Sequence, residues 1–200
     1  LQSASEAFTI LSRMSGENIA KFLETYADLI EGSSDSLVAM ASHETGLPVA
    51  PRLSGAELPR TTGQLRQAAA AARTGSWKQA TIDTANNIRS CLGPLGPVCV
   101  FGPNNFPFAF NSIAGGDFAA AIAAGNPVIA KANTSHPGTT KLFAELAQQA
   151  AIKTGMPDGT VQLIYRTTHE DGARLVSDHR VGATGYTGSR HAGLALKAAA

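Results

Sequence analysis

The second half of the chain alternates short apolar runs with longer stretches of helical periodicity, and no other feature of the sequence constrains the fold as strongly. The apolar runs cover residues 97–101, 127–131, 161–165 and 181–186, and the helical stretches cover residues 112–124, 138–153, 171–177 and 188 onward. Alternation of this kind is typical of βαβ units, in which parallel strands are buried on both faces. The sequence therefore predicts an α/β fold with a parallel sheet.

The first half of the chain has helical rather than strand periodicity. Five apolar residues recur at a spacing that places them on one face of a helix ending at Gly32: Ile19, Phe22, Leu23, Tyr26 and Ile30. Further helices are expected over residues 36–45 and 62–73, with a proline-rich loop over residues 48–59 between them. Residues 75–89 are expected to form short strands or irregular chain.

Charged residues are sparse in this sequence. They make up 16 % of the chain, against about 25 % in a typical soluble domain, so we expect another domain or subunit to cover much of the surface. The uncharged stretch from Ser90 to Gly116 is not expected to span a membrane, because its prolines and asparagines would leave polar groups unsatisfied in hydrocarbon. The net charge of +1 gives no reason to expect nucleic acid or an anionic membrane as a partner.

The cysteines and histidines indicate neither a disulfide framework nor a metal site. The chain has two cysteines, Cys91 and Cys99, and we expect it to reside in a reducing compartment, the cytoplasm. The five histidines show no metal-ligand spacing,. Cys99 alternates with apolar residues and is expected to be a buried, unreactive thiol. Cys91 has no base near it in the sequence, so neither cysteine is expected to be a nucleophile.

Parallel sheets bind ligands at the carboxyl ends of their strands, so the loops that follow the strands are the candidate functional segments. In the loop after the first strand, prolines stiffen the chain around Asn104 and Asn105. A side-chain amide held there is able to stabilise a developing oxyanion. Alternatively, both asparagines cap the next helix or fill turn positions.

Two more positions lie at strand ends. Lys131 ends the second strand, where it either holds a phosphate or a ribose hydroxyl or is a solvated strand end. Thr187, Gly188 and Ser189 open the last helix, whose free N–H groups and dipole favour a pyrophosphate. A plain helix N-terminus is the alternative, because the usual Gly-x-Gly-x-x-Gly pattern is absent.

Several segments together resemble the aldehyde dehydrogenase superfamily, and the resemblance extends from about Glu6 to Ala200. The matching stretches are residues 44–48, 97–107, 121–131, 155–159 and 186–189. Within the superfamily, residues 60–66, 115–117 and 131–139 resemble one branch more than the others. That branch contains the 2,5-dioxovalerate (α-ketoglutaric semialdehyde) dehydrogenases and NADP-using fatty aldehyde dehydrogenases.

This resemblance implies a Rossmann-like parallel sheet with helices on both faces, preceded by an N-terminal helical segment. Residues 1–95 would form the N-terminal helical part of a cofactor domain, and residues 96–200 its nucleotide-binding core. The implied reaction is the NAD(P)-dependent oxidation of an aldehyde to a carboxylic acid through a thiohemiacetal and hydride transfer. The expected substrate is a small oxo-acid semialdehyde such as 2,5-dioxopentanoate.

The resemblance also implies roles for individual residues. Asn105 matches the family's asparagine that stabilises the oxyanion, and Lys131 matches the lysine that contacts the adenosine ribose or its phosphate. Ser189, with Gly188 beside it, matches the residue at the pyrophosphate. Four residues would line the nicotinamide side of the site: Phe101, Gly102, Pro103 and Asn104.

Thr134 and Arg166 bear on the choice of cofactor. Many NAD-using relatives have a glutamate where Thr134 stands, and a carboxylate there repels the 2′-phosphate of NADP, whereas a hydroxyl does not. Arg166 stands where the family usually has glycine, and it either reaches an adenosine phosphate or obstructs the usual adenine path. NADP is the expected cofactor, with NAD as the alternative.

The family's catalytic cysteine and glutamate lie beyond the Thr-Gly-Ser motif, and neither Cys91 nor Cys99 matches that cysteine. We therefore expect the 200 residues to be part of a longer enzyme and to be inactive alone. The resemblance implies that the full-length enzyme forms a homo-oligomer, a dimer or a tetramer. The alternative is a non-catalytic nucleotide-binding module or a natural truncation.

Overall fold

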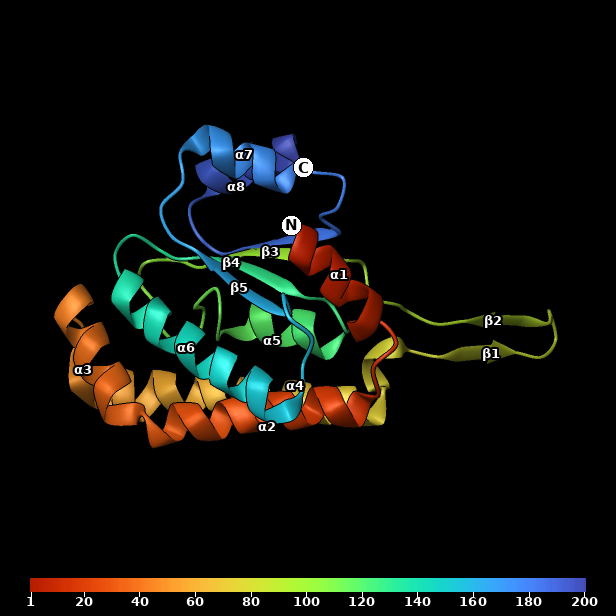
Figure 1. Ribbon diagram of the computed structural model, residues 1–200, viewed down its shortest axis with the longest axis horizontal. Coiled ribbons are helices and arrows are strands. Elements are labelled where there is room, and N and C mark those ends of the chain that lie inside the picture. The colour runs from red at the N-terminus through yellow and green to blue at the C-terminus, as the bar shows by residue number, and fades with distance from the viewer.

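Helices cover both faces of a four-stranded parallel sheet (Figure 1). The computed structural model describes residues 1–200. The strands of this sheet are β3 (Val98–Phe101), β4 (Val128–Lys131), β5 (Val161–Ile164) and β6 (Ala183–Tyr186). The helices are α1 (Gln2–Leu11), α2 (Gly16–Gly32), α3 (Ser34–Thr45), α4 (Leu58–Thr74), α5 (Gly116–Ala123), α6 (Pro137–Thr154), α7 (His169–Val176) and α8 (Arg190–Ala199). The predicted α/β class, with helices on both faces and an N-terminal helical segment, is confirmed.

The order of the strands creates a crevice at one edge of the sheet. The order is β5-β4-β3-β6, so the chain steps outward from β3 to β5 and then returns to place β6 on the other side of β3. Such a reversal is the position where open α/β sheets bind ligands, just beyond the carboxyl ends of the strands. Phe101 pairs with both Lys131 and Tyr186, so three strands end level at this edge.

Alternate residues of the strands face two separate apolar clusters. Val100 and Ala130 belong to the main core, which they share with α2, α4, α5 and α6. Cys99 and Ile129 face the opposite way, into a small cluster with residues of α1, α7 and α8. This alternation follows from the two-residue period of a strand, and Figure 1 shows the corresponding helices above and below the sheet.

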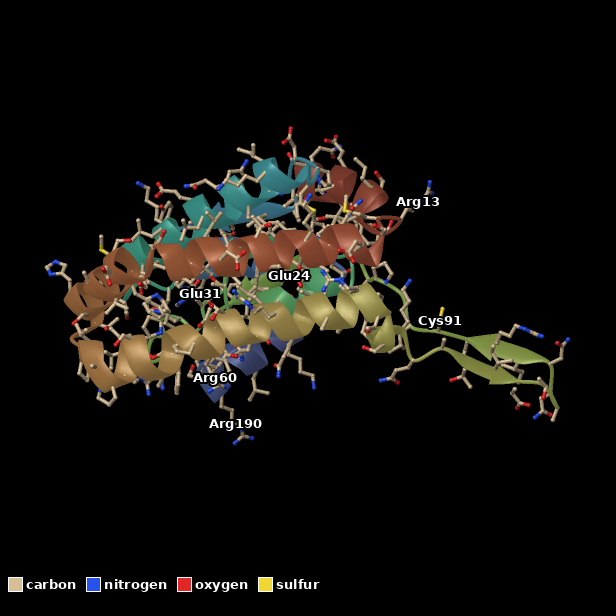
Figure 2. All side chains as sticks on the ribbon, turned by 90° about the horizontal axis from the view of Figure 1, so that it is seen from below. Arg13, Glu24, Glu31, Arg60, Cys91 and Arg190 are labelled. Carbon is tan, nitrogen blue, oxygen red and sulfur yellow. The ribbon has the colours of Figure 1, made fainter.

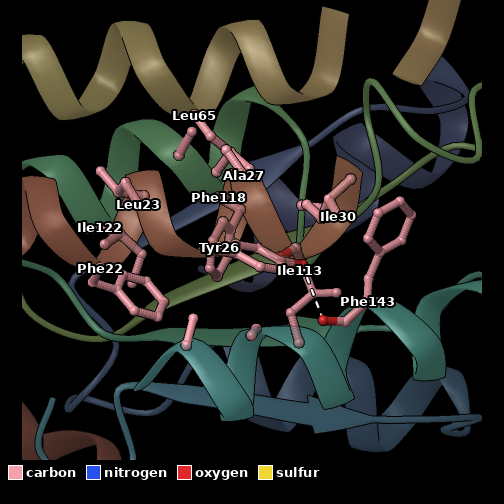
Figure 3. Packing of buried hydrophobic residues seen from close by; sticks show 14 of the residues in the cluster. Phe22, Leu23, Tyr26, Ala27, Ile30, Leu65, Ile113, Phe118, Ile122 and Phe143 are labelled. Carbon is pink, nitrogen blue, oxygen red and sulfur yellow. Dashed lines mark hydrogen bonds between the residues drawn. The ribbon is translucent and has the colours of Figure 1, made fainter. Parts of the chain in front are cut away.

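Tyr26 of α2 joins three elements in the main core (Figure 3). Its side chain is fully buried, and its hydroxyl oxygen lies 3.1 Å from the carbonyl oxygen of Ile113 and 3.0 Å from that of Phe143. Burial raises the pKa of Tyr26 well above its usual value, so the hydroxyl keeps the proton that it shares between these acceptors. The bond fixes α2 against α6 and against the segment before α5.

Two helices begin four residues away from the predicted position, each for a local reason. The helix expected from residue 112 begins at Gly116, because the Asn111 side chain bonds the chain around it as a turn. Its Oδ1 accepts from the Ile113 N–H at 3.1 Å and its Nδ2 donates to the Pro107 carbonyl at 2.8 Å. The helix expected from residue 62 begins at Leu58, because Pro59 lies in the first turn, where no intrahelical donor is needed.

The remaining segments of the first half take three forms. The expected loop over residues 48–59 contains a kinked run of helical turns, Val49–Glu57, which is interrupted by extended backbone at Ala50 and leads into α4. Residues 75–89 contain a short helix, Ser76–Lys78, and an antiparallel hairpin formed by β1 (Thr81–Asp83) and β2 (Ile88–Ser90). This hairpin projects from the body of the molecule (Figure 1).

None of the helices combines the length and the apolar character that crossing a membrane requires.

Candidate functional site

A cleft of about 400 Å³ lies where β3 and β6 end. It is lined by Pro103, Asn104, Asn105, Phe106, Phe110, Thr187, Gly188 and Ser189. The structure thus brings together the loop after β3 and the residues that open α8, as expected from their places at strand ends. Of the residues singled out from the sequence, Pro103, Asn104, Asn105, Gly188 and Ser189 line this cleft.

The loop that carries Asn105 is held from below by Glu57, a carboxylate with only 2 % of its surface exposed. Glu57 Oε2 accepts from the N–H groups of Phe108 and Ala109 at 3.0 and 3.2 Å, and its Oε1 accepts from Arg52 Nε at 2.9 Å. Arg52 Nη2 in turn donates to the carbonyl oxygen of Asn105 at 2.8 Å. Glu57 and Arg52 therefore fix the backbone that positions the Asn105 side chain.

The same loop is held from the other side by the segment after β4. Asn133 Nδ2 donates to the Gly102 carbonyl at 3.0 Å. His136, 1 % exposed, places Nε2 3.0 Å from the Pro103 carbonyl oxygen and Nδ1 3.3 Å from Thr140 Oγ1. Because a carbonyl oxygen only accepts, Nε2 must carry a hydrogen.

Gly102 lets these segments approach closely. A Cβ atom on Gly102 would lie 2.5 Å from the carbonyl oxygen of Phe110 and 3.0 Å from the Ser112 nitrogen. Both are backbone atoms of the chain that follows the loop, so any side chain at Gly102 would displace that chain and Phe110 with it. The position is thus restricted to glycine by packing.

Four helices begin near this edge of the sheet, and only the first turn of α8 is free of acidic residues. The first turn of α5 contains Asp117, whose carboxyl group is hydrogen-bonded to Thr187, just before α8. Glu44 occupies the N-terminus of α6, where it accepts from the N–H groups of Gly138 and Thr139 at 2.7 and 2.8 Å. The first turn of α7 contains Glu170 and Asp171. The first turn of α8 has no acidic residue, and its dipole therefore remains available to an anion in the cleft.

A pair of cations lies further along the same edge, outside the cleft lining. Lys131 ends β4, and Arg166 lies two residues beyond the end of β5. Burial lowers the pKa of Lys131, and the positive charge of Arg166 lowers it further. Neither cation has a carboxylate partner in an ion pair, so this part of the edge, with the exposed Thr134 nearby in the chain, favours a bound anion.

The two cysteines lie away from the cleft. Cys99 is buried in β3, and burial raises the pKa of its thiol to about 11, so it is a thiol and not a thiolate at neutral pH. The expectation that Cys99 is buried is confirmed. Cys91 is exposed beside the projecting hairpin (Figure 2).

Sequence reasoning did not single out the residues that position the loop. Glu57 bonds to amides 51 and 52 residues later in the chain, and no local pattern indicates such a contact. Phe106 and Phe110 were also not given a role from the sequence. Thr187, which was placed with Gly188 and Ser189 at the start of the last helix, lines the cleft as they do.

The whole of this chain, residues 1–200, matches the model of the aldehyde dehydrogenase family. The chain belongs to the aldehyde dehydrogenase family. The resemblance found in the sequence motifs is therefore confirmed. Family membership does not by itself assign a role to any residue of the cleft, and the roles given above for Asn105, Lys131, Thr134, Arg166 and Ser189 stay predictions.

Curated relatives include two semialdehyde dehydrogenases. The chain is 48 % identical over 186 residues to alpha-ketoglutaric semialdehyde dehydrogenase 2 of Azospirillum brasilense, and the matched region covers 88 % of this chain and 35 % of the relative. It is 40 % identical over 204 residues to alpha-ketoglutaric semialdehyde dehydrogenase of Acinetobacter baylyi, and the matched region covers 98 % of this chain and 38 % of the relative. This aldehyde dehydrogenase chain thus spans little more than a third of the length of these relatives.

Among solved structures, PnpE in complex with nicotinamide adenine dinucleotide has the same fold. Its TM-score to this chain is 0.84 at 24 % sequence identity, and the match covers 99 % of this chain and 39 % of PnpE. At this identity, the likeness establishes the aldehyde dehydrogenase fold of the chain.

Proposed function

We propose that the full-length protein oxidises a small oxo-acid semialdehyde, such as 2,5-dioxopentanoate, to the carboxylic acid with NAD(P)+ as hydride acceptor. The observation that carries the proposal is the cleft at the ends of β3 and β6, which Asn105 lines together with the residues that open α8. Semialdehyde dehydrogenases that are 40–48 % identical to the chain support the substrate class.

The described residues fit a dinucleotide at this edge of the sheet. The N-terminus of α8, with no acidic residue in its first turn and with Gly188 and Ser189 at its start, suits a pyrophosphate. Lys131, Thr134 and Arg166 would bind the adenosine ribose and its phosphate. Phe101 to Asn104, at the end of β3, would line the nicotinamide side. When bound, NAD(P)+ supplies the hydride acceptor of the reaction.

In the proposed reaction, Asn105 acts on the aldehyde oxygen. Its side-chain amide would donate a hydrogen bond as negative charge develops on that oxygen, and the stiff loop would keep the amide aimed without reorganisation. The cysteine that attacks the aldehyde and the glutamate that activates water would come from outside residues 1–200. The chain described here contributes the cofactor site and the oxyanion donor.

Formation of NADH or NADPH, followed at 340 nm, tests the proposed activity. The full-length protein should reduce the dinucleotide when mixed with 2,5-dioxopentanoate and should form the carboxylic acid in equal amount. If dinucleotide binds but no aldehyde in a panel of semialdehydes and simple aldehydes is oxidised, the chain would instead belong to a non-catalytic nucleotide-binding protein.

We further propose that NADP+ is the preferred cofactor, because Thr134, Lys131 and Arg166 together leave positive charge uncompensated where a 2′-phosphate would lie. Replacing Thr134 by glutamate should lower kcat/KM for NADP+ by about 10- to 50-fold through charge repulsion, and change kcat/KM for NAD+ little. Thr134→Ser keeps the hydroxyl and serves as the control. An unchanged ratio between the two cofactors in Thr134→Glu would place the 2′-phosphate elsewhere.

Arg166→Gly separates the two interpretations of Arg166 when cofactor binding is measured. If Arg166 binds the phosphate, calorimetric titration of the full-length variant should show weaker NADP+ binding and unchanged NAD+ binding. If Arg166 obstructs the adenine path, both cofactors should bind the variant more tightly.

We also propose that the full-length protein is a cytoplasmic homo-oligomer, a dimer or a tetramer. Four large apolar side chains on and beside the hairpin are exposed, a feature that marks interaction surfaces: Ile82, Ile88, Leu92 and Leu95. Both cysteines are unpaired, as is usual in a reducing compartment. Sedimentation equilibrium should give a mass of two or four chains, and a monomer would contradict the proposal.

A further inference from the structure

Two aromatic rings of the cleft wall each carry an arginine. The rings of Phe106 and Phe110, which line the cleft, meet edge to face with their centroids 5.2 Å apart. The Arg52 guanidinium carbon lies 4.2 Å from the centroid of Phe106, and that of Arg60 lies 4.8 Å from the centroid of Phe110. Cation–π contacts at these distances hold both guanidinium groups beside the cleft.

The two arginines differ in their charge environment. Arg52 is neutralised by Glu57 at 2.9 Å and donates to the Asn105 carbonyl. Arg60 lies in the first turn of α4, is exposed, and makes neither an ion pair nor a hydrogen bond. Figure 2 labels it beside α4. Arg60 is thus a cation at the cleft wall with no carboxylate of the chain to pair with.

The lining of the cleft offers no charge of its own to Arg60, and the Asp117 carboxyl group at its rim is hydrogen-bonded to Thr187. All the residues that line the cleft are uncharged. The Arg60 guanidinium lies over an aromatic ring and makes no hydrogen bond, so its N–H groups are free, and these groups match the two oxygens of a carboxylate,. The wall that carries Asn105 at one end therefore has, at the ring of Phe110, a site suited to an organic acid.

We propose that Arg60 binds the carboxylate of the substrate and thereby selects oxo-acid semialdehydes over aldehydes without an acid group. The inference rests on the proposed function, since it names the residue that recognises the acid end of the same substrate. With the aldehyde oxygen at Asn105, the substrate would extend along Phe106 and Phe110 toward the Arg60 guanidinium. Arg60 acts in binding and specificity, not in the chemical step.

The test compares a charged and a neutral substrate in the full-length enzyme. For Arg60→Gln, kcat/KM for 2,5-dioxopentanoate should fall by about 10- to 100-fold, mainly through KM, because a charge-assisted bidentate contact is lost. The value for pentanal, which has the same chain length and no carboxylate, should stay within about twofold. Arg60→Lys keeps the positive charge but lacks the planar guanidinium. Its kcat/KM for 2,5-dioxopentanoate should therefore lie between those of the wild type and Arg60→Gln.

Arg66→Gln is the matched control. Arg66 is an exposed arginine on the same helix, but it pairs with Asp28 and Glu31 on α2 at 2.7 and 3.0 Å. Arg66→Gln should change kcat/KM for neither substrate, because exposed ion pairs contribute little to stability. If kcat/KM fell for both substrates in Arg60→Gln, Arg60 would have a structural role. If kcat/KM fell for neither, the carboxylate would bind elsewhere. Either result overturns the inference.

Glutarate gives a second readout, because it carries the carboxylate but no aldehyde that reacts. It should inhibit the wild-type enzyme competitively with 2,5-dioxopentanoate, and the inhibition constant should rise in Arg60→Gln by about as much as KM does. Equal inhibition of both proteins would contradict a carboxylate site at Arg60. If the wild type oxidises pentanal and 2,5-dioxopentanoate equally well, only the inference on Arg60 fails. If it oxidises no aldehyde, the proposed function fails and the inference fails with it.

Discussion

Full-length protein carrying Asn105→Ala should turn over semialdehyde about 10²- to 10³-fold more slowly than the wild type, because an oxyanion loses its preorganised hydrogen-bond donor. The loss should appear in kcat, since the interaction forms as charge develops on the aldehyde oxygen. The Kd for the dinucleotide should change little. Steady-state rates at saturating dinucleotide, together with calorimetric titration of the cofactor, measure both quantities.

Asn104→Ala is the control for this prediction. Asn104 is the neighbouring asparagine, is also exposed and lines the same cleft, so its loss removes a similar amide from the same loop. We expect a change in kcat of less than about tenfold, because Asn104 is not aimed at the aldehyde oxygen in the proposed arrangement. If Asn105→Ala turns over as fast as the wild type, or if both variants lose activity equally, Asn105 is not the oxyanion donor.

Glu57→Ala should destabilise the fold by about 2–4 kcal/mol, because two buried amides and the Arg52 guanidinium lose their acceptor together. Glu57 is almost fully buried, so water does not readily replace it at the N–H groups of Phe108 and Ala109. Loosening of the same loop should also lower kcat, since Arg52 would no longer be held against the Asn105 carbonyl. The midpoint of urea unfolding, read for the cofactor-free protein, reports the loss of stability.

Two variants separate the role of Glu57 from a general effect of removing a carboxylate. Glu31→Ala removes an exposed carboxylate that pairs with Arg66 and should cost less than about 0.5 kcal/mol. Glu57→Gln keeps the shape but offers a single acceptor oxygen, so its unfolding midpoint should fall between those of the wild type and Glu57→Ala. An unfolding midpoint for Glu57→Ala equal to that of Glu31→Ala would show that Glu57 does not hold the loop.

The strands of the sheet were predictable because their sequences leave few alternatives. Each apolar run of the second half coincides with a strand to within a few residues, since a run of buried aliphatic residues between helices has no other place in an α/β fold. Helix ends were less predictable, because they depend on single side chains. Asn111 delays the start of α5 through its own hydrogen bonds, and Pro59 is accommodated in the first turn of α4.

The site was predictable where its parts are local and not where they are distant in sequence. Asn105, Gly188 and Ser189 follow directly from their places after strands β3 and β6. Glu57 was not identified, because a glutamate just before an amphipathic helix reads as a solvated residue. Only the folded chain places its carboxylate beneath the loop 51 residues later.

The most direct test of the account is a crystal structure of the full-length protein with NADP+ bound. We expect the pyrophosphate at the start of α8 beside Ser189 and the nicotinamide in the cleft next to Asn105. The 2′-phosphate should lie among Lys131, Thr134 and Arg166. Electron density for the dinucleotide at any other surface of the chain would contradict the account.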